Sequence, residues 1–288
     1  MPRHGQRRGL FAHSAWDALL VLLALLEVGL LVLGVAALEP LVARLGPWPA
    51  AGVLAGLGLV GVFLNCTNFQ CVSHNFLHNP FFTWRPLNRT FGVVNTLGLG
   101  VPQCLYRVHH LDHHRHGNDR VDPASGTTRD RSSTWRFGRD GREEPLWRYA
   151  LLGPFRTEFG FLYAGARRRD GALQVAAESL ALLLFVGGLG LLSWRGLLLF
   201  WLPVWYLGEV AAFAENWLEH RGATPGSRLT DSVSCYGRLY NLVWFNNGYH
   251  QEHHWRPQVH WTGVPALRAQ MLPESQRRVV RLAHWINW

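Results

Sequence analysis

The stretch NNGYHQEHHWRP, residues 246–257, places three histidines within five positions. His250, His253 and His254 form an HxxHH pattern. On an α-helix, positions i, i+3 and i+4 project from one face, so the three imidazoles converge on one point. Neutral imidazole is a common ligand for transition metals. The stretch therefore predicts a metal-binding helix, and the rest of the fold has to bring further ligands to it.

Three other segments carry histidines in related patterns. HNFLH contains an HxxxH pair, HLDHH contains a second HxxHH pattern, and ENWLEHRG contains an isolated histidine after a long apolar run. Any one segment is equally well explained by a group of surface or core histidines. Nine of the fifteen histidines in four such places favour one shared metal site instead. The candidate ligands are His74, His78, His110, His113, His114, His220, His250, His253 and His254.

The apolar residues gather in long blocks, which predicts an all-α integral membrane protein. About twenty apolar residues at ~1.5 Å per residue span the ~30 Å hydrocarbon core of a bilayer. The first block is longer than the apolar region of a signal peptide, so we expect a retained membrane helix there. Glu27 interrupts it, and we expect this carboxylate to make an interhelical contact. The four expected spans are about 17–38, 50–71, 172–194 and 197–218.

The charge pattern predicts the orientation of these spans. The net charge is +9, and all 28 basic residues are arginine. They flank the apolar blocks, which favours lipid headgroups over nucleic acid as their partner. Fifteen arginines lie within 80–171, whereas the two loops expected on the opposite side hold only Arg44 and Arg195. The positive-inside rule then predicts a multi-pass protein, of a bacterial inner membrane, with cytoplasmic termini and a cytoplasmic active site.

We expect a single membrane domain over residues 1–288. Its cytoplasmic histidine-rich cap would consist of residues 74–171 and 220–288, together with interfacial helices. The segment 80–102 is too broken by glycine and proline for another span and is typical of an interfacial or re-entrant segment. Residues 115–145 are rich in Arg, Asp, Ser and Gly, which predicts a solvated loop.

The number of histidines points to the chemistry. Nine imidazoles exceed the three or four ligands of a zinc site and suit two metal ions, and an all-imidazole set is compatible with iron. Two irons beside a membrane suggest activation of O2 for attack on an unactivated C–H bond of a lipid chain, which acid–base side chains cannot achieve. Four nearby acids either orient imidazoles or are ordinary solvated carboxylates: Asp112, Glu215, Glu219 and Glu252.

The motifs HNFLH, HLDHH and YHQEHH resemble the three histidine boxes of the membrane fatty acid desaturase and hydroxylase superfamily, over roughly residues 70–265. The resemblance implies a di-iron centre with the nine histidines as ligands, at the cytoplasmic ends of four helices, and a tunnel for an acyl or alkyl chain. It also implies that Asn216, four residues before His220, contacts a metal through water. No fused electron carrier is evident, so we expect electrons from a separate ferredoxin, rubredoxin or cytochrome.

Two motifs resemble membrane alkane hydroxylases instead. NWLEHRG is similar to their NYxEHYG motif, and DPAS, residues 122–125, is similar to the segment after their second box. Their second box is HxxxHH, which His109, His113 and His114 also satisfy. His109 therefore competes with His110 for one ligand role. We favour His110, because YRVHHLDHHRHGND is most similar to a desaturase box.

The leading interpretation is thus a lipid desaturase that uses O2 and two irons. The closest alternative is a hydroxylase of the same superfamily, acting on an alkyl, acyl or terpenoid chain. A zinc-dependent membrane hydrolase is an alternative of another class. A metal transporter is disfavoured, because it would place histidines within the spans, whereas these lie at the expected helix ends.

Overall fold

The computed structural model describes residues 9–117, 122, 124–127, 129, 131, 142–224 and 226–287. Most of the predicted solvated loop, including Pro123 of the DPAS segment, lies outside these residues.

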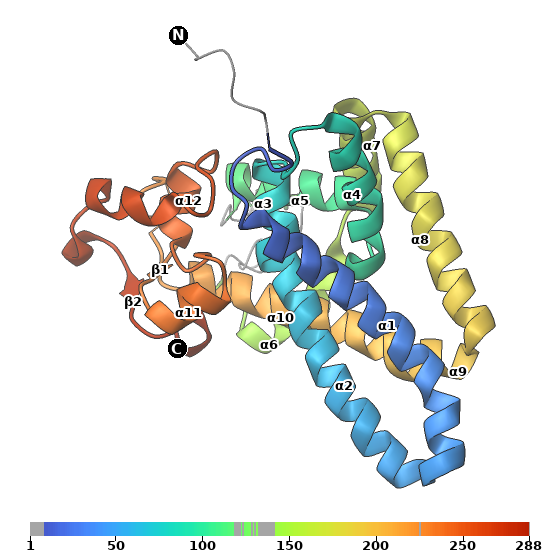
Figure 1. Ribbon diagram of the computed structural model, residues 1–288. Helices are drawn as coiled ribbons and strands as arrows, with labels where there is room; N and C mark the ends of the chain where they lie inside the picture. Colours follow the sequence, from blue (N-terminus) through green and yellow to red (C-terminus); the bar gives the residue numbers. More distant parts are fainter. Residues whose placement is uncertain are drawn as a thin grey trace.

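Four helical rods dominate the described structure, as the apolar blocks predict (Figure 1). Each is long and apolar enough to cross a membrane. The rods are α1 (Asp17–Leu45); α2 (Pro47–Thr67) continued by the π-helix η1 (Asn68–Ser73) and α3 (His74–His78); α8 (Ala172–Leu192); and α9 (Trp194–Gly196) continued by the π-helix η3 (Leu197–Trp201) and α10 (Leu202–His220). The fold is therefore all-α with four candidate spans.

The first two rods are longer than the sequence indicated. α1 continues through Pro40 to Leu45, and Gly46 alone separates it from α2. Gly46 has a φ of 80°, which glycine adopts without steric cost. Pro47 then opens α2, where its missing N–H removes no helical hydrogen bond.

Two π-helical segments interrupt the regular helical turn of the rods, one beside the first histidine pair and one beside a proline. The segment η1 lies directly before His74 and so sets the rotation at which α3 presents its histidines. The segment η3 ends two residues before Pro203, whose ring would clash with the carbonyl four residues earlier in a regular helix. The wide turn accommodates the proline without ending the rod.

Shorter elements surround one end of the rods. They are α4 (Arg85–Leu99), α5 (Gln103–His116), α6 (Leu146–Leu152), η2 (Gly153–Arg156), α7 (Phe159–Asp170), α11 (Arg238–Val243), α12 (His250–Trp255), η4 (Val264–Gln270), η5 (Glu274–Gln276), η6 (His284–Ile286) and the strands β1 (Ser234–Cys235) and β2 (Val279–Val280). The two strands pair in parallel. The C-terminal elements form a lobe at the end opposite the α1–α2 turn (Figure 1).

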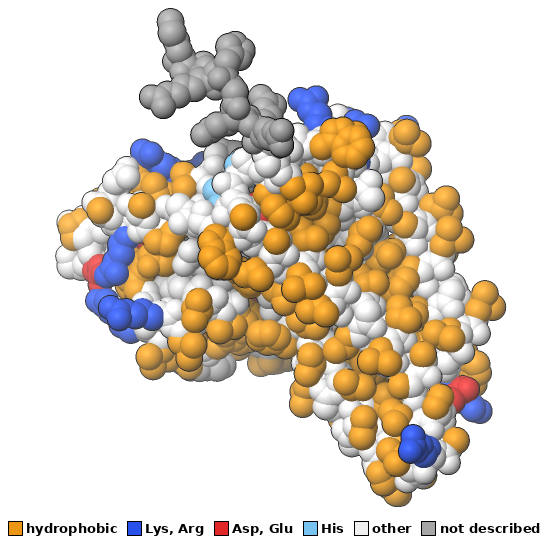
Figure 2. Space-filling model, in the orientation of Figure 1, with side chains coloured by type: hydrophobic (Ala, Val, Ile, Leu, Met, Phe, Trp, Pro, Cys, Tyr) orange, Lys and Arg blue, Asp and Glu red, His pale blue; other side chains and the backbone are white. Residues whose placement is uncertain are grey.

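The surface of the rods is apolar. Leucines such as Leu33, Leu59, Leu183 and Leu191 are exposed on α1, α2 and α8. Hydrophobic side chains cover most of the face in Figure 2, and basic side chains lie mainly near its ends. An exposed apolar belt of this extent fits the interior of a bilayer, where helices satisfy their own backbone hydrogen bonds.

Glu27 is the centre of a buried polar network between the rods. Its carboxylate accepts hydrogen bonds from Asn65 Nδ2 at 2.8 Å and from Asn68 Nδ2 at 2.6 Å. Asn68 also donates to Asn95 on α4, and Asn95 donates to Gln103 at the start of α5. The network confirms the predicted interhelical contact and ties the rods to the helix that carries HLDHH.

Replacing Glu27 by Leu should lower the thermal unfolding midpoint of the detergent-solubilised protein. The amides of Asn65 and Asn68 would lose a buried acceptor, and each unsatisfied group costs about 1–3 kcal/mol. Glu39→Leu is the matched control, because Glu39 is an exposed carboxylate near the other end of the same helix. Equal shifts in the two variants would contradict a role for the network in stability.

Candidate metal centre

The nine predicted ligands come from four separate elements. α3 begins with His74 and ends with His78, and α10 ends with His220. The last two turns of α5 carry the HLDHH histidines, and α12 carries those of YHQEHH. Every box is therefore helical, as its spacing predicts.

The structure brings all nine rings together in two neighbouring groups. Within each group, one ligand atom from every residue lies within 4.8 Å of the others. The five-histidine group is His74, His78, His110, His114 and His253. The four-histidine group is His113, His220, His250 and His254.

The grouping follows a rule within each HxxHH pattern. His110 and His114, at i and i+4, belong to the five-histidine group, whereas His113 belongs to the other. In the C-terminal box the assignment to groups is reversed. His250 and His254, at i and i+4, belong to the four-histidine group, and His253 belongs to the five-histidine group. On a helix, positions i and i+4 lie about 40° apart and position i+3 lies about 60° to the other side of i. Each box therefore serves both groups.

The ring nitrogens meet in a way that hydrogen bonding does not explain. Nε2 of His220 lies 3.2 Å from Nε2 of His113 and 3.3 Å from Nε2 of His250. A neutral imidazole has one donor and one acceptor nitrogen, so three nitrogens that face one point cannot all be paired. Both nitrogens of His78 and Nε2 of His254 are buried without a partner among the described residues. Convergent, unpaired imidazole nitrogens fit a metal ion in each group.

Burial keeps these rings in the form that binds metals. Desolvation, followed by the neighbouring imidazoles, holds the pKa well below its usual range for His110, His113, His114, His250 and His253. The rings are therefore neutral near pH 7. A neutral imidazole has a free lone pair for a metal, so no proton has to leave before binding.

Carboxylate and carbonyl oxygens lie beside the Nδ1 atoms of several rings. Glu219 Oε1 lies 3.5 Å from Nδ1 of His250. Asp231, which sequence analysis missed, lies 3.5 Å from Nδ1 of His254, and its main-chain oxygen lies 2.9 Å from Nδ1 of His220. Such partners fix the tautomer of a ligating imidazole. Asp231 belongs to a polar loop with no helical spacing to a box, so no sequence pattern marked it.

The other three acids singled out from the sequence contact groups outside the two clusters. Asp112 accepts from the N–H of Arg131, Glu215 accepts from Tyr240, and Glu252 accepts from Ser234 and Tyr236. These contacts join segments of the scaffold. Of the four acids, and within the described residues, only Glu219 lies directly beside an imidazole of the two groups. Glu215 and Glu219 also lie near His284, a buried histidine whose Nε2 lies 2.8 Å from the oxygen of Val233.

The first turn of α5 is held by two side chains from other helices. Glu178 on α8 accepts from the N–H of Cys104 at 2.7 Å, and Thr96 on α4 accepts from the N–H of Gln103 at 3.0 Å. These contacts satisfy N–H groups that have no partner within the helix. Glu178 was not singled out from the sequence, although it is the one acid within the apolar run 172–192.

The structure separates the two competing histidines of the second box. His110 lies in the five-histidine group. His109 lies outside both groups and stacks on Tyr106, with ring centroids 6.2 Å apart and an interplanar angle of 19°. The geometry therefore favours His110 as the candidate ligand and makes His109 part of a cavity wall.

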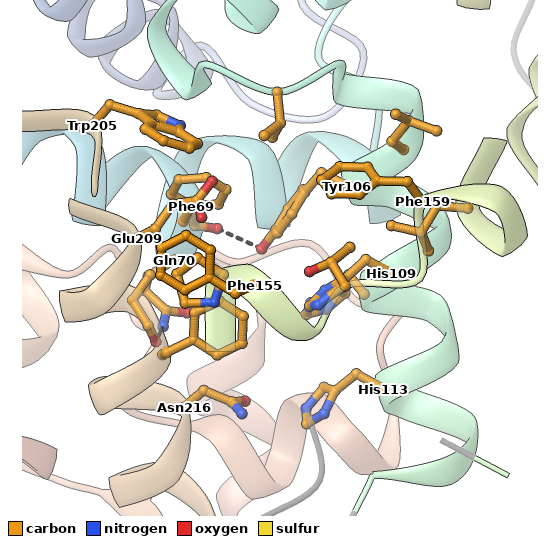
Figure 3. Close-up of a pocket in the computed structure, with 18 of the residues that line it drawn as sticks. Phe69, Gln70, Tyr106, His109, His113, Phe155, Phe159, Trp205, Glu209 and Asn216 are labelled. Atoms are coloured by element: carbon orange, nitrogen blue, oxygen red, sulfur yellow. Dashed lines mark hydrogen bonds between the residues drawn. The ribbon is translucent and has the colours of Figure 1, made fainter. Parts of the chain in front are cut away.

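A largely apolar cavity of about 350 Å³ adjoins the histidines. Phe69, Leu105, Tyr106, Phe155, Trp205 and Phe213 line it, and His110, His113 and His250 reach it from both groups. Asn216 and His113 lie at one end of the cavity and Trp205 lies at the other (Figure 3). Asn216 donates to the hydroxyl of Tyr149 at 2.7 Å, which fixes the amide beside the four-histidine group.

The four spans, the two histidine groups and the apolar cavity together define a class of integral membrane proteins with a histidine-rich metal site. The sequence matches the family model for "Fatty acid desaturase" over residues 45–285, and the chain belongs to this family. A metal cofactor is therefore implied by the family as well as by the histidine groups.

The chain is also similar to curated relatives from plants and animals. It is 25% identical to "Sphingolipid delta(4)-desaturase DES1-like" of Oryza sativa subsp. japonica, over 78% of this chain and 66% of the relative. It is 29% identical to "Sphingolipid delta(4)-desaturase DES1" of Mus musculus, over 72% of this chain and 63% of the relative. It is 30% identical to "Putative sphingolipid delta(4)-desaturase/C4-monooxygenase" of Caenorhabditis elegans, over 72% of this chain and 56% of the relative. The chain thus spans less than two thirds of the length of these relatives.

The buried neutral rings should make metal-free stability depend on pH. Burial lowers the pKa of His253 in the folded protein, while the unfolded chain takes up the proton near pH 6.5. The ring therefore destabilises the fold as the pH falls below about 6.5, by about 1.4 kcal/mol at pH 5.5. We expect metal-free His253→Gln to lose less stability than the unaltered protein between pH 7.5 and 5.5, measured by thermal unfolding. Because all other titrating groups are shared, identical losses would show that the ring is not held neutral.

Proposed function

We propose that this protein is an O2-dependent lipid desaturase that removes two hydrogens from neighbouring carbons of a saturated chain. The observation that carries the proposal is the position of two imidazole groups beside one end of an apolar cavity, in a membrane protein of the fatty acid desaturase family. The names of the relatives support desaturation of a lipid chain.

We propose one iron in each histidine group. His74, His78, His110, His114 and His253 would hold one ion, and His113, His220, His250 and His254 would hold the other. Asn216, beside the group with only four imidazoles, would contact its ion through water. When bound, the irons would supply the activation of O2 and the removal of hydrogen that no side chain in the cavity can provide.

The chain's own residues would bind the substrate and shape its surroundings. The aromatic and aliphatic walls would hold a hydrocarbon chain and exclude water from the reacting carbons. His110 and His113, which both line the cavity, would present one ring from each group to the same stretch of chain. Glu219 and Asp231 would keep their imidazole partners in the ligating tautomer.

The membrane setting leads to two further proposals. The excess of arginine outside the two short loops supports cytoplasmic termini and a cytoplasmic metal centre, in a bacterial inner membrane. The proposed reaction needs two electrons per turnover in addition to O2. A separate ferredoxin, rubredoxin or cytochrome would deliver them, and the arginine-rich surface suits an acidic carrier.

Purified protein should contain about two irons per chain and little zinc, because the two groups suit one ion each. His78→Ala and His220→Ala change different groups and should each reduce the iron content. His13→Ala is the control, since His13 is exposed and belongs to neither group. Elemental analysis by mass spectrometry provides the measurement. A protein loaded with zinc alone would favour the hydrolase alternative and contradict the iron proposal.

Expression in a host should produce lipids lighter by two mass units than their saturated precursors, detected by whole-lipid mass spectrometry. His253→Ala should abolish the product, because it removes a ring from the five-histidine group, whereas His13→Ala should retain it. A gain of 16 mass units without a double bond would identify the hydroxylase alternative. The name of the Caenorhabditis elegans relative includes a monooxygenase as well as a desaturase. Absence of both products would count against either oxidation.

A further inference from the structure

The cavity wall contains a carboxylate that the proposed chemistry does not use. Glu209 lies on α10, is only 8% exposed and lines the apolar cavity. Burying a carboxyl group among apolar side chains is unfavourable unless it gains a partner. Within a membrane-spanning helix, such a residue is a candidate functional site by default.

Glu209 does not resemble the structural carboxylate of the same bundle. Both oxygens of Glu27 accept hydrogen bonds from asparagine amides, so that side chain ties helices together. Glu209 instead faces the cavity, and the indole of Trp205, four residues earlier on its own helix, lines the cavity beside it. Such a contact within one helix does not explain why a carboxylate lines a hydrocarbon cavity.

A second polar group lies beside Glu209. Gln70, on η1, lines the same cavity, and its Nε2 donates to the main-chain oxygen of Ala212 at 2.8 Å. Ala212 is one turn after Glu209 on α10, so the bond holds the Gln70 amide next to the carboxylate. An amide that donates through its nitrogen keeps its carbonyl oxygen as an acceptor. The two side chains therefore offer acceptor oxygens from two different rods.

The Glu209 carboxyl lies well away from the histidine of its own helix. Glu209 precedes Asn216 by seven residues and His220 by eleven, which places it about 10 and 16 Å from them along the helix axis. In Figure 3, Glu209 and Gln70 lie between Trp205 and the end marked by Asn216 and His113. Glu209 is therefore a feature of the chain-binding part of the cavity, whereas Gln70, four residues before His74, lies one helical turn from the metal centre.

We propose that Glu209 and Gln70 form a polar subsite that binds a hydrogen-bond donor, a hydroxyl or an amide N–H, carried by the lipid chain. The inference rests on the proposed function in taking a lipid as the occupant of the cavity. The subsite would fix the distance between the donor and the reacting carbons. It would favour such lipids over chains whose only polar group is an ether or ester oxygen, because those groups cannot donate to the two acceptor oxygens.

Binding of hexadecan-1-ol and of its methyl ether tests the subsite without turnover. Both chains would compete with a pyrene-labelled hydrocarbon for the metal-loaded protein in detergent. A hydrogen bond to an acceptor buried among apolar side chains corresponds to about a threefold to tenfold preference for the alcohol. Glu209→Leu should reduce this preference to below about twofold, whereas the nearly isosteric Glu209→Gln keeps an acceptor oxygen and should retain most of it. Glu39→Gln removes an exposed carboxyl from another rod and should leave the preference unchanged.

The inference is overturned if the unaltered protein binds alcohol and ether equally, or if Glu209→Leu keeps the full preference. The comparison in the unaltered protein needs no variant, so a folding defect in one variant does not remove the test. If the protein desaturates lipids but binds alcohol and ether equally, only the proposed subsite is rejected. If the protein prefers the alcohol but forms no oxidised product, only the proposed reaction is rejected.

Discussion

The structure depends on holding nine largely buried imidazoles against one another. Their nitrogens approach to 2.7 Å between His74 and His253 and to 2.9 Å between His110 and His114. Buried polar atoms that lack partners destabilise a fold, and among these nine histidines such atoms come from α3, α5 and α12. Bound metal ions would give these nitrogens partners. In the metal-free protein, the helices must be held together by other contacts. The polar contacts outside the two groups serve that purpose.

Those contacts act at the ends of the elements that carry histidines. Glu178 and Thr96 hold the start of α5, and the Glu27 network joins the same helix to α1 and α2. Behind α12, Glu252 accepts from Ser234 and Tyr236, and Arg277 donates to the hydroxyl of Tyr236 at 2.6 Å. α12 has only six residues and would not be stable by itself. Its three rings therefore depend on this buried hydrogen-bonded support.

The sequence was informative wherever the signal was local. Apolar length predicted the four rods, and helical spacing predicted that the histidines of each box share a face. The division into groups of five and four could not be read in the same way, because it depends on how α5 and α12 face each other. His113 and His253 each join the group opposite to that of their box neighbours. Asp231 and Glu178 were missed for a related reason, since their roles arise from contacts between segments 11 or more residues apart.

The crossed arrangement has a consequence for how the two groups can work. Because each HxxHH helix contributes to both, a rotation of α5 or α12 cannot change one group while the other stays intact. The cavity meets His110 from one group and His113 and His250 from the other, so a bound chain would face both at a fixed separation. Two independent metal sites could be built on separate helices. A reaction that uses two metals on one stretch of substrate needs both sites at a fixed separation, which shared helices provide. The sharing of helices therefore favours a single two-metal centre over two separate structural ions.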